Sequence, residues 1–242
     1  MELDILAIGA HPDDIELSCS GTVAKSAEAG YSVGLLDLTE GELGTRGTVE
    51  IRSREARRAA LILGVRVREN LRLPDGDIQV NPKNIRQLIQ VLRHYRPKIL
   101  LIPYSEERHP DHEHAHRLCR EAWFYAGLRK IPTKFRGKSQ SPWRAHAVFQ
   151  YMQWREFTPT FVVDISDVYA KREKAILAFT SQFYNPALKE PQTMLSQKSF
   201  LDLLEARARL FGEKIGARYG EPFYSHDLIG VNDLFHLRLV KN

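Results

Sequence analysis

The sequence of 242 residues predicts an α/β protein with a Rossmann-like, mostly parallel sheet and helices on both faces of that sheet. The first observation is that apolar runs of about five residues alternate with helical patterns of about ten to fifteen residues as far as Gly127. This alternation is typical of β-α-β units, whose strands lie parallel. The second observation is that no internal repeat and no long linker interrupts the chain. We therefore expect a single domain over residues 1–242, with a regular half at 1–127 and a completing half at 128–242.

The regular half contains the patterns of three strands and four helices. The strands are the apolar runs at residues 3–8, 33–38 and 98–102. The helices are the stretches at residues 20–29, 50–63, 82–95 and 112–126. Gly30, Gly64 and Gly127 each follow a helix as its C-terminal cap, and Asn81-Pro82 joins an N-cap to a proline at the first helical position.

The completing half keeps these element types but loses their regular alternation. In the regular half, Leu71-Arg72-Leu73 leads into a turn at Pro74-Asp75-Gly76. The completing half begins with an irregular stretch at 128–143 that is rich in proline and lysine. Strand-like runs follow at residues 147–152 and 160–165, and helical patterns at 168–179 and about 198–215. We assign no element to the last 25 or so residues.

The composition is that of an ordinary globular chain, with 43% hydrophobic and 27% charged residues. No apolar run approaches the roughly 18 residues needed to cross a membrane. The acidic start, Met1-Glu2-Leu3-Asp4, does not have the pattern of a signal peptide. Cys19 and Cys119 are too few for a disulfide framework. These features predict a cytoplasmic protein with two free thiols and no membrane partner.

The net charge of +5 has a local origin. Residues 122–155 contain seven basic side chains and no acidic one, which leaves the rest of the chain at −2. A basic segment of this kind can border a crevice that takes an acidic substrate, or face a neighbouring subunit.

Two short motifs that follow predicted strands contain the histidine and aspartate residues from which we predict a functional site. His11-Pro12-Asp13-Asp14 comes after the first strand, and His109-Pro110-Asp111-His112 comes after the strand at 98–102. The carboxyl ends of parallel strands share one edge of the sheet, so we expect the two motifs to meet there. Imidazole and carboxylate side chains are ligands of zinc, and a catalytic site uses three of them and leaves a position open.

The spacing suggests a separate role for each residue of the two motifs. His11, Asp14 and His112 are the expected metal ligands. Asp13 is placed to accept a proton from the attacking water. His109, as an imidazolium, is expected to stabilise the oxyanion or to protonate the leaving amine, and Asp111 to orient a histidine.

Three other functions compete with this metal site. His112-Glu113-His114-Ala115-His116 matches the HExxH pattern of metalloproteases, but it leaves residues 11–14 unexplained. A nucleotide-binding module would need a glycine-rich turn after the first strand, which Gly9-Ala10-His11-Pro12 does not provide. A nucleic-acid binder would rely on the basic segment and its aromatic residues, yet no recognised motif accompanies them. We expect no nucleic-acid partner.

The paired motifs resemble those of the LmbE-like (PIG-L-type) zinc N-deacetylases, which hydrolyse the N-acetyl group of N-acetylglucosamine conjugates. Further stretches resemble the bacillithiol-biosynthesis branch, in which the substrate is N-acetylglucosaminyl-malate. They are the segment from Asp37 to Thr48, Arg52, Leu73-Pro74-Asp75-Gly76 and Ser181-Gln182-Phe183-Tyr184. The resemblance covers essentially the whole chain and implies the same ligands and the same base, Asp13.

The resemblance also implies a substrate-binding set and an assembly. Arg52 matches a substrate-contacting arginine, Arg108 is a further candidate, and Tyr184 is a candidate to replace a tyrosine that some relatives use where this chain has Phe200. Zn²⁺ is the implied cofactor, with Fe²⁺ as the alternative because both accept this donor set. The implied partners are a small sugar conjugate and other copies of the chain in a hexamer or trimer. The expected conjugate is N-acetylglucosaminyl-malate, and the alternative is another N-acetylglucosamine conjugate or a chitooligosaccharide.

Overall fold

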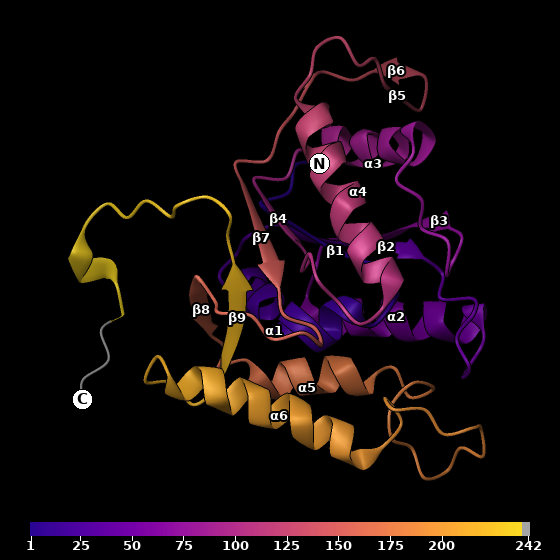
Figure 1. The fold of residues 1–242 in the computed structure, drawn as a ribbon, viewed down its shortest axis with the longest axis vertical. Coiled ribbons are helices and arrows are strands. Elements are labelled where there is room, and N and C mark those ends of the chain that lie inside the picture. The colour runs from indigo at the N-terminus through magenta and orange to yellow at the C-terminus, as the bar shows by residue number, and fades with distance from the viewer. Residues whose placement is uncertain (239–242) are drawn as a thin grey trace.

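The computed structural model describes residues 1–238, which contain one seven-stranded sheet with helices on both faces (Figure 1). The strand order is β3-β2-β1-β4-β7-β9-β8. Their bounds are β1 Ile5–Gly9, β2 Val33–Thr39, β3 Val67–Leu73, β4 Ile99–Pro103, β7 Ala147–Tyr151, β8 Phe161–Asp164 and β9 Gly220–Tyr224. The strands from β3 to β7 in this order are parallel, whereas β9 is antiparallel to both of its neighbours. The predicted fold class is confirmed.

The helices divide between the two faces of the sheet and bury two separate cores. Their bounds are α1 Asp14–Glu28, α2 Val49–Leu63, α3 Pro82–Tyr95, α4 Pro110–Ala126, α5 Tyr169–Leu177 and α6 Lys198–Glu213. One core lies under α1, α2, α5 and α6, and the other lies under α3 and α4. Along β1, Ile5 and Ala7 enter the first core while Leu6 and Ile8 enter the second, as the alternation of side chains along a strand requires.

The strand order reverses at β1, which has β2 on one side and β4 on the other. In open α/β sheets the crevice at the carboxyl ends of such a strand pair is the usual site of ligand binding. The sheet therefore places the ends of β1 and β4 where a functional site is expected.

Helix α1 begins at Asp14, six residues earlier than the pattern at 20–29 predicts. Residues 14–24 are all buried, so this part of the helix shows no polar face by which to recognise it. The helix also bends at Cys19, where φ is −142°. The Glu221 carboxylate accepts the N–H groups of Gly21 and Thr22 at 2.9 and 2.7 Å beyond the bend, which compensates for interrupted helical bonds.

Three other elements were not predicted from the sequence. Strand β3 is half-buried and largely polar, because it lies at the edge of the sheet. Strand β9 comes from the last 25 or so residues and inserts between β7 and β8. A two-stranded hairpin, β5 Lys134–Phe135 and β6 Lys138–Ser139, turns through Arg136 and Gly137, which both have positive φ.

The remaining predicted strands and helices agree with the structure to within about two residues at each end. Within residues 1–238, no helix is long and apolar enough to span a bilayer. Cys19 and Cys119 are both buried free thiols.

Candidate metal centre

The two motifs meet at the carboxyl ends of β1 and β4. The loop after β1 carries residues 11–14, and the loop after β4 carries residues 109–112. These strands are neighbours, with Ala7 opposite Leu101, so the two loops leave the sheet side by side. The predicted convergence of the motifs is confirmed.

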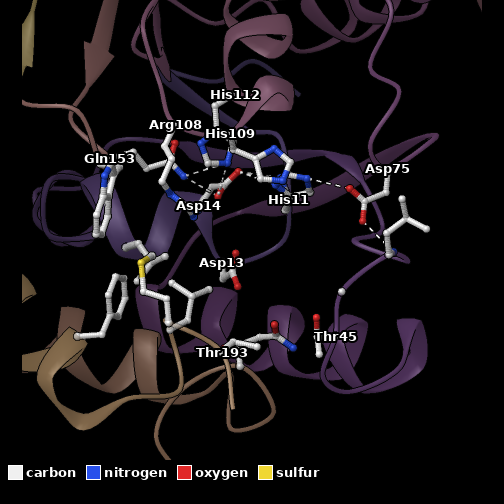
Figure 2. Close-up of a pocket in the computed structure, with 18 of the residues that line it drawn as sticks. His11, Asp13, Asp14, Thr45, Asp75, Arg108, His109, His112, Gln153 and Thr193 are labelled. Atoms are coloured by element: carbon white, nitrogen blue, oxygen red, sulfur yellow. Dashed lines mark hydrogen bonds and ion pairs between the residues drawn. The ribbon is translucent and has the colours of Figure 1, made fainter. Parts of the chain in front are cut away.

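Three side chains present their ligand atoms to one another at this edge. The ligand atoms of His11, Asp14 and His112 all lie within 4.8 Å of one another. Asp14 is central, because its Oδ2 lies 3.5 Å from Nδ1 of His11 and its Oδ1 lies 3.3 Å from Nε2 of His112 (Figure 2). Burial acts to raise the pKa of Asp14, but His112 and His11 hold it well below its usual range. An ionised carboxylate between two imidazoles is a donor set that fits a divalent cation.

The other ring nitrogen of His11 is directed at two carboxylates. Its Nε2 lies 2.9 Å from Oδ1 of Asp75 and 3.4 Å from Oδ2 of Asp111. A nitrogen that faces two carboxylates carries the ring proton, which leaves Nδ1 available to a cation. Burial acts to lower the pKa of His11, but Asp111, Asp14 and Asp75 together raise it well above its usual value, so without a cation Nδ1 also holds a proton, which a bound cation would displace. The position of Asp111 agrees with the orienting role predicted for it.

His11, His109 and Asp111 form a second group whose geometry could hold a metal ion. We assign the cation to the first group, because Nε2 of His11 is directed at Asp75 and Asp111, whereas Nδ1 of His11 is directed at Asp14. Asp111 Oδ2 accepts the N–H of Gly76 at 2.7 Å, and Nδ1 of His109 accepts the N–H of Asp111 at 3.2 Å.

Asp13 is buried and held in an unusual backbone conformation. It is the N-cap residue of α1 and has a φ of 118°, a region that favours glycine and costs other residues about 1–3 kcal/mol. Arg52 stabilises this turn by donating to Oδ2 of Asp13 at 3.1 Å and to the carbonyl oxygen of Pro12 at 2.6 Å. Burial raises the pKa of Asp13 to about 7 although Arg52 acts to lower it. Such a value suits a group that exchanges protons near neutral pH.

His109 caps the N-terminus of α4 and lines the same cavity. Its ring centroid lies 4.9 Å from that of His11 and 5.1 Å from that of His112. Burial lowers the pKa of His109, and the charges of His11 and His112 lower it further. Its Nδ1 accepts a backbone N–H and therefore carries no proton. Nε2 is therefore the nitrogen from which His109 can donate, and its expected part at the oxyanion or the leaving amine stays a prediction.

The metal centre forms the floor of a cavity of about 280 Å³. One side carries the imidazole and carboxylate groups just described. The opposite side is apolar and is formed by Leu17, Met194, Leu195, Phe200 and Leu204. This volume lies near the lower end of the range for small-molecule sites, so the cavity suits one small polar ligand with an apolar face.

The predicted substrate-binding residues have different positions. Arg52 lines the cavity but is 5% exposed and bound to Asp13, so its observed contacts hold the loop between β1 and α1. Arg108 is exposed at the cavity, with its guanidinium carbon 5.4 Å from the centroid of the Trp154 ring. Tyr184 is 46% exposed and is not among the cavity-lining residues, so the structure does not bring it to the centre, and its role as a substitute for the missing tyrosine stays a prediction. Phe200 belongs to the apolar wall.

The geometry also rules out the HExxH interpretation. Nδ1 of His116 lies 3.0 Å from the carbonyl oxygen of Pro103, and His116 belongs to no candidate metal group within residues 1–238. The Glu113 carboxylate accepts the N–H of Glu107 at 3.0 Å. His116 and Glu113 are therefore engaged in holding the loop before α4.

The basic segment lies mostly away from the centre. The β5–β6 hairpin follows the C-terminal end of α4, whereas His112 is at the N-terminal end of this helix of 17 residues (Figure 1). A helix of that length extends about 25 Å. From residues 122–155 only Gln153 and Trp154 line the cavity. The expectation that the basic side chains border the crevice is wrong, and the alternative, that they face a neighbouring subunit, stays a prediction.

Two side chains at the centre were not predicted. Asp75 lies in the turn Leu73-Pro74-Asp75-Gly76, where only the resemblance gave a signal. Gln153 follows β7, and its amide nitrogen lies 2.5 Å from Oδ1 of Asp14. No motif surrounds Gln153, so nothing in the sequence alone indicates its position.

Comparison with known proteins adds independent information. Residues 6–123 match the sequence model of the PIG-L family, GlcNAc-PI de-N-acetylase. The diacetylchitobiose deacetylase of Thermococcus kodakarensis is 32% identical over 229 residues, which is 90% of this chain and 80% of that protein.

Two solved structures have the same fold. A conserved protein of Thermus thermophilus is 38% identical with a TM-score of 0.85, and the match covers 95% of this chain and 98% of that chain. The N,N'-diacetylchitobiose deacetylase of Pyrococcus horikoshii is 26% identical with a TM-score of 0.75, over 90% of this chain and 82% of that chain.

Proposed function

The chain belongs to the PIG-L, or LmbE-like, family of N-deacetylases, and on that premise we propose that it hydrolyses the N-acetyl group of an N-acetylglucosamine unit at the metal centre. The observation that carries the proposal is the convergence of His11, Asp14 and His112 beside the buried carboxyl group of Asp13. The reaction consumes water and releases acetate and a free amine.

The first substrate class in this proposal is a short chitooligosaccharide. Two similar proteins, from Thermococcus kodakarensis and Pyrococcus horikoshii, are named as deacetylases of diacetylchitobiose. They support this class better than the malate conjugate of the bacillithiol branch. The malate conjugate remains the second candidate because Arg108 is exposed at the cavity and its guanidinium forms no ion pair among residues 1–238.

Each residue at the centre has a chemical part in this reaction. A bound divalent cation polarises the acyl carbonyl and lowers the pKa of the attacking water. Asp13 accepts a proton from that water, and Arg52 keeps the Asp13 carboxylate in place. His109 donates from Nε2 to the developing oxyanion. The amine leaves with the proton that Asp13 accepted, and the apolar wall excludes water from the acyl methyl group.

Acetate release from a small substrate panel tests this proposal. The purified protein is expected to deacetylate N,N'-diacetylchitobiose with a kcat/KM at least about tenfold above that for N-acetylglucosaminyl-malate. Chelation is expected to reduce the rate more than about 100-fold, and added Zn²⁺ to restore it, because the cation supplies the carbonyl polarisation. Parallel restoration with Fe²⁺ measures which metal supports turnover. The absence of acetate release from every N-acetylglucosamine substrate, with metal present, would refute the proposal.

We also propose that the protein forms a homo-oligomer through its C-terminal segment, residues 225–238. Leu228 is 101% exposed and Phe235 is 95% exposed, in a segment that follows β9 and returns to the body where Arg238 contacts Asp164 and Gly216 (Figure 1). Leu234 and three other apolar side chains of the segment are exposed as well. Exposed apolar side chains that gather in one segment mark an interaction site, and covering them with another copy of the chain would remove this apolar surface from water.

Light scattering after size-exclusion chromatography tests the assembly. The wild-type protein is expected to elute as an oligomer, and the double variant Leu228→Ser, Phe235→Ser as a monomer with an unchanged circular dichroism spectrum, because neither side chain packs on its own body. A wild-type protein that is monomeric at tens of micromolar would contradict this proposal.

A further inference from the structure

We propose that Gln153 is a positioning residue of the metal centre, and that Glu107 and Arg207 hold it there by binding the peptide unit between Gln153 and Trp154. The inference assumes the proposed cation at His11, Asp14 and His112. The test measures metal binding in the absence of substrate, so its result does not depend on which reaction the protein catalyses.

The side chain of Gln153 contacts two of the three ligand residues. Its Nε2 lies 2.5 Å from Oδ1 of Asp14 and 3.5 Å from Nε2 of His112 (Figure 2). The other Asp14 oxygen, Oδ2, accepts the N–H of His11 at 2.8 Å. Each carboxylate oxygen thus has one donor and keeps a further lone pair for a cation. Gln153 and the His11 N–H together fix the plane in which Asp14 can bind the metal.

The backbone beside Gln153 is held from both sides by charged side chains. Its carbonyl oxygen accepts a hydrogen bond from Nη1 of Arg207 on α6. The N–H of Trp154, across the same peptide bond, donates to Oε1 of Glu107 at 2.8 Å, and the N–H of Arg155 donates to the same atom at 3.1 Å. Hydrogen bonds to charged groups are the stronger ones, so this peptide unit has little freedom to rotate.

Glu107 and Arg207 also connect this peptide to the segments that carry the ligands. Glu107 is 5% exposed and lies in the loop between β4 and α4, two residues before His109. Arg207 reaches the carbonyl oxygen of Leu17 in α1 at 3.4 Å, three residues after Asp14. These two charged side chains therefore join the Gln153 loop to the α4 loop, α1 and α6, and they set the distance between Gln153 and the ligands.

Side chains that orient metal ligands typically contribute a factor of about 10 to 100 in metal affinity. Gln153 lies beside the metal ligands, but glutamine is not one of the residue types usually considered as metal ligands. The amide oxygen of Gln153 is buried without a partner among residues 1–238, so no other contact of this side chain explains its orientation.

The experiment compares Gln153→Leu, which keeps the volume and removes the amide, with Trp154→Ala, its neighbour in the cavity wall. Metal affinity is measured by competition with a chromophoric chelator. Gln153→Leu is expected to weaken binding about 10- to 100-fold. It is also expected to shift the visible absorption of the Co²⁺-loaded protein and to lower kcat with little change in KM. Trp154→Ala is expected to keep the affinity within about threefold, because the Trp154 ring packs beside the Arg108 guanidinium and its backbone N–H to Glu107 is retained.

A second pair of variants tests whether Glu107 and Arg207 fix the peptide unit between Gln153 and Trp154. Glu107→Gln retains an oxygen that can accept the N–H of Trp154, so we expect metal affinity to be retained. Arg207→Met removes the donor to the Gln153 carbonyl, and we expect the same direction of change as in Gln153→Leu, in protein whose circular dichroism is unchanged. Wild-type metal affinity and an unshifted Co²⁺ spectrum in Gln153→Leu would overturn the role of Gln153, and wild-type metal affinity in Arg207→Met would overturn the role of Arg207 in holding it.

Discussion

Asp14→Ala is expected to remove metal binding and N-acetyl hydrolysis together, whereas His116→Ala is expected to spare both. Asp14 lies between His11 and His112, so its loss leaves two imidazoles without the carboxylate that brings them together. We expect metal affinity to fall by more than about 100-fold, beyond the usual effect of residues that only orient ligands. The rate of acetate release should fall to background.

The His116 variant is the matched control, because His116 belongs to the competing HExxH pattern. It is buried, and its ring nitrogen lies 3.0 Å from the Pro103 carbonyl oxygen. Its removal should therefore lower the free energy of unfolding by about 1–3 kcal/mol without altering metal content. Metal analysis of the two purified variants and thermal denaturation provide the measurements. Loss of the metal from His116→Ala, with retention in Asp14→Ala, would reverse the assignment of the centre.

Asp13→Asn is expected to lower kcat by about 10²–10⁴-fold while metal affinity stays within a few-fold of wild type. Asparagine has the shape of aspartate and tolerates positive φ, so the turn before α1 should persist. Its amide cannot accept the proton from the attacking water. Metal content and kcat measured on the same sample separate the two effects, and full activity in this variant would refute the role of base.

The pH profile offers a further check on Asp13. Burial raises the pKa of this group to about 7, and a base works only when it is deprotonated. The wild-type kcat/KM should therefore fall as the pH decreases through the pKa of Asp13. Any residual activity of Asp13→Asn should lack that acidic limb. An identical limb in both proteins would assign it to another group.

Much of the fold was predictable because its determinants are local. The apolar runs at β1, β2 and β4 and the caps Asn81 and Gly64 act over a few residues, so each is visible in the sequence. The elements that were missed depend on distant partners. The first turns of α1 are buried by α5 and β9, and Glu221 supports the bend at Cys19 from 200 residues away.

The site shows the same division between sequence and tertiary structure. The sequence by itself determined the two motifs, their places at strand ends and the donor types that predict a cation, because chemistry and spacing are properties of neighbouring residues. Only the tertiary structure decided that Asp75 and Asp111 both approach Nε2 of His11, and that Gln153 contacts Asp14. It also decided that the β5–β6 hairpin lies at the end of α4 away from the metal centre. These relations join segments that meet only when the sheet forms, so their physical cause is the strand order and the packing of helices on it.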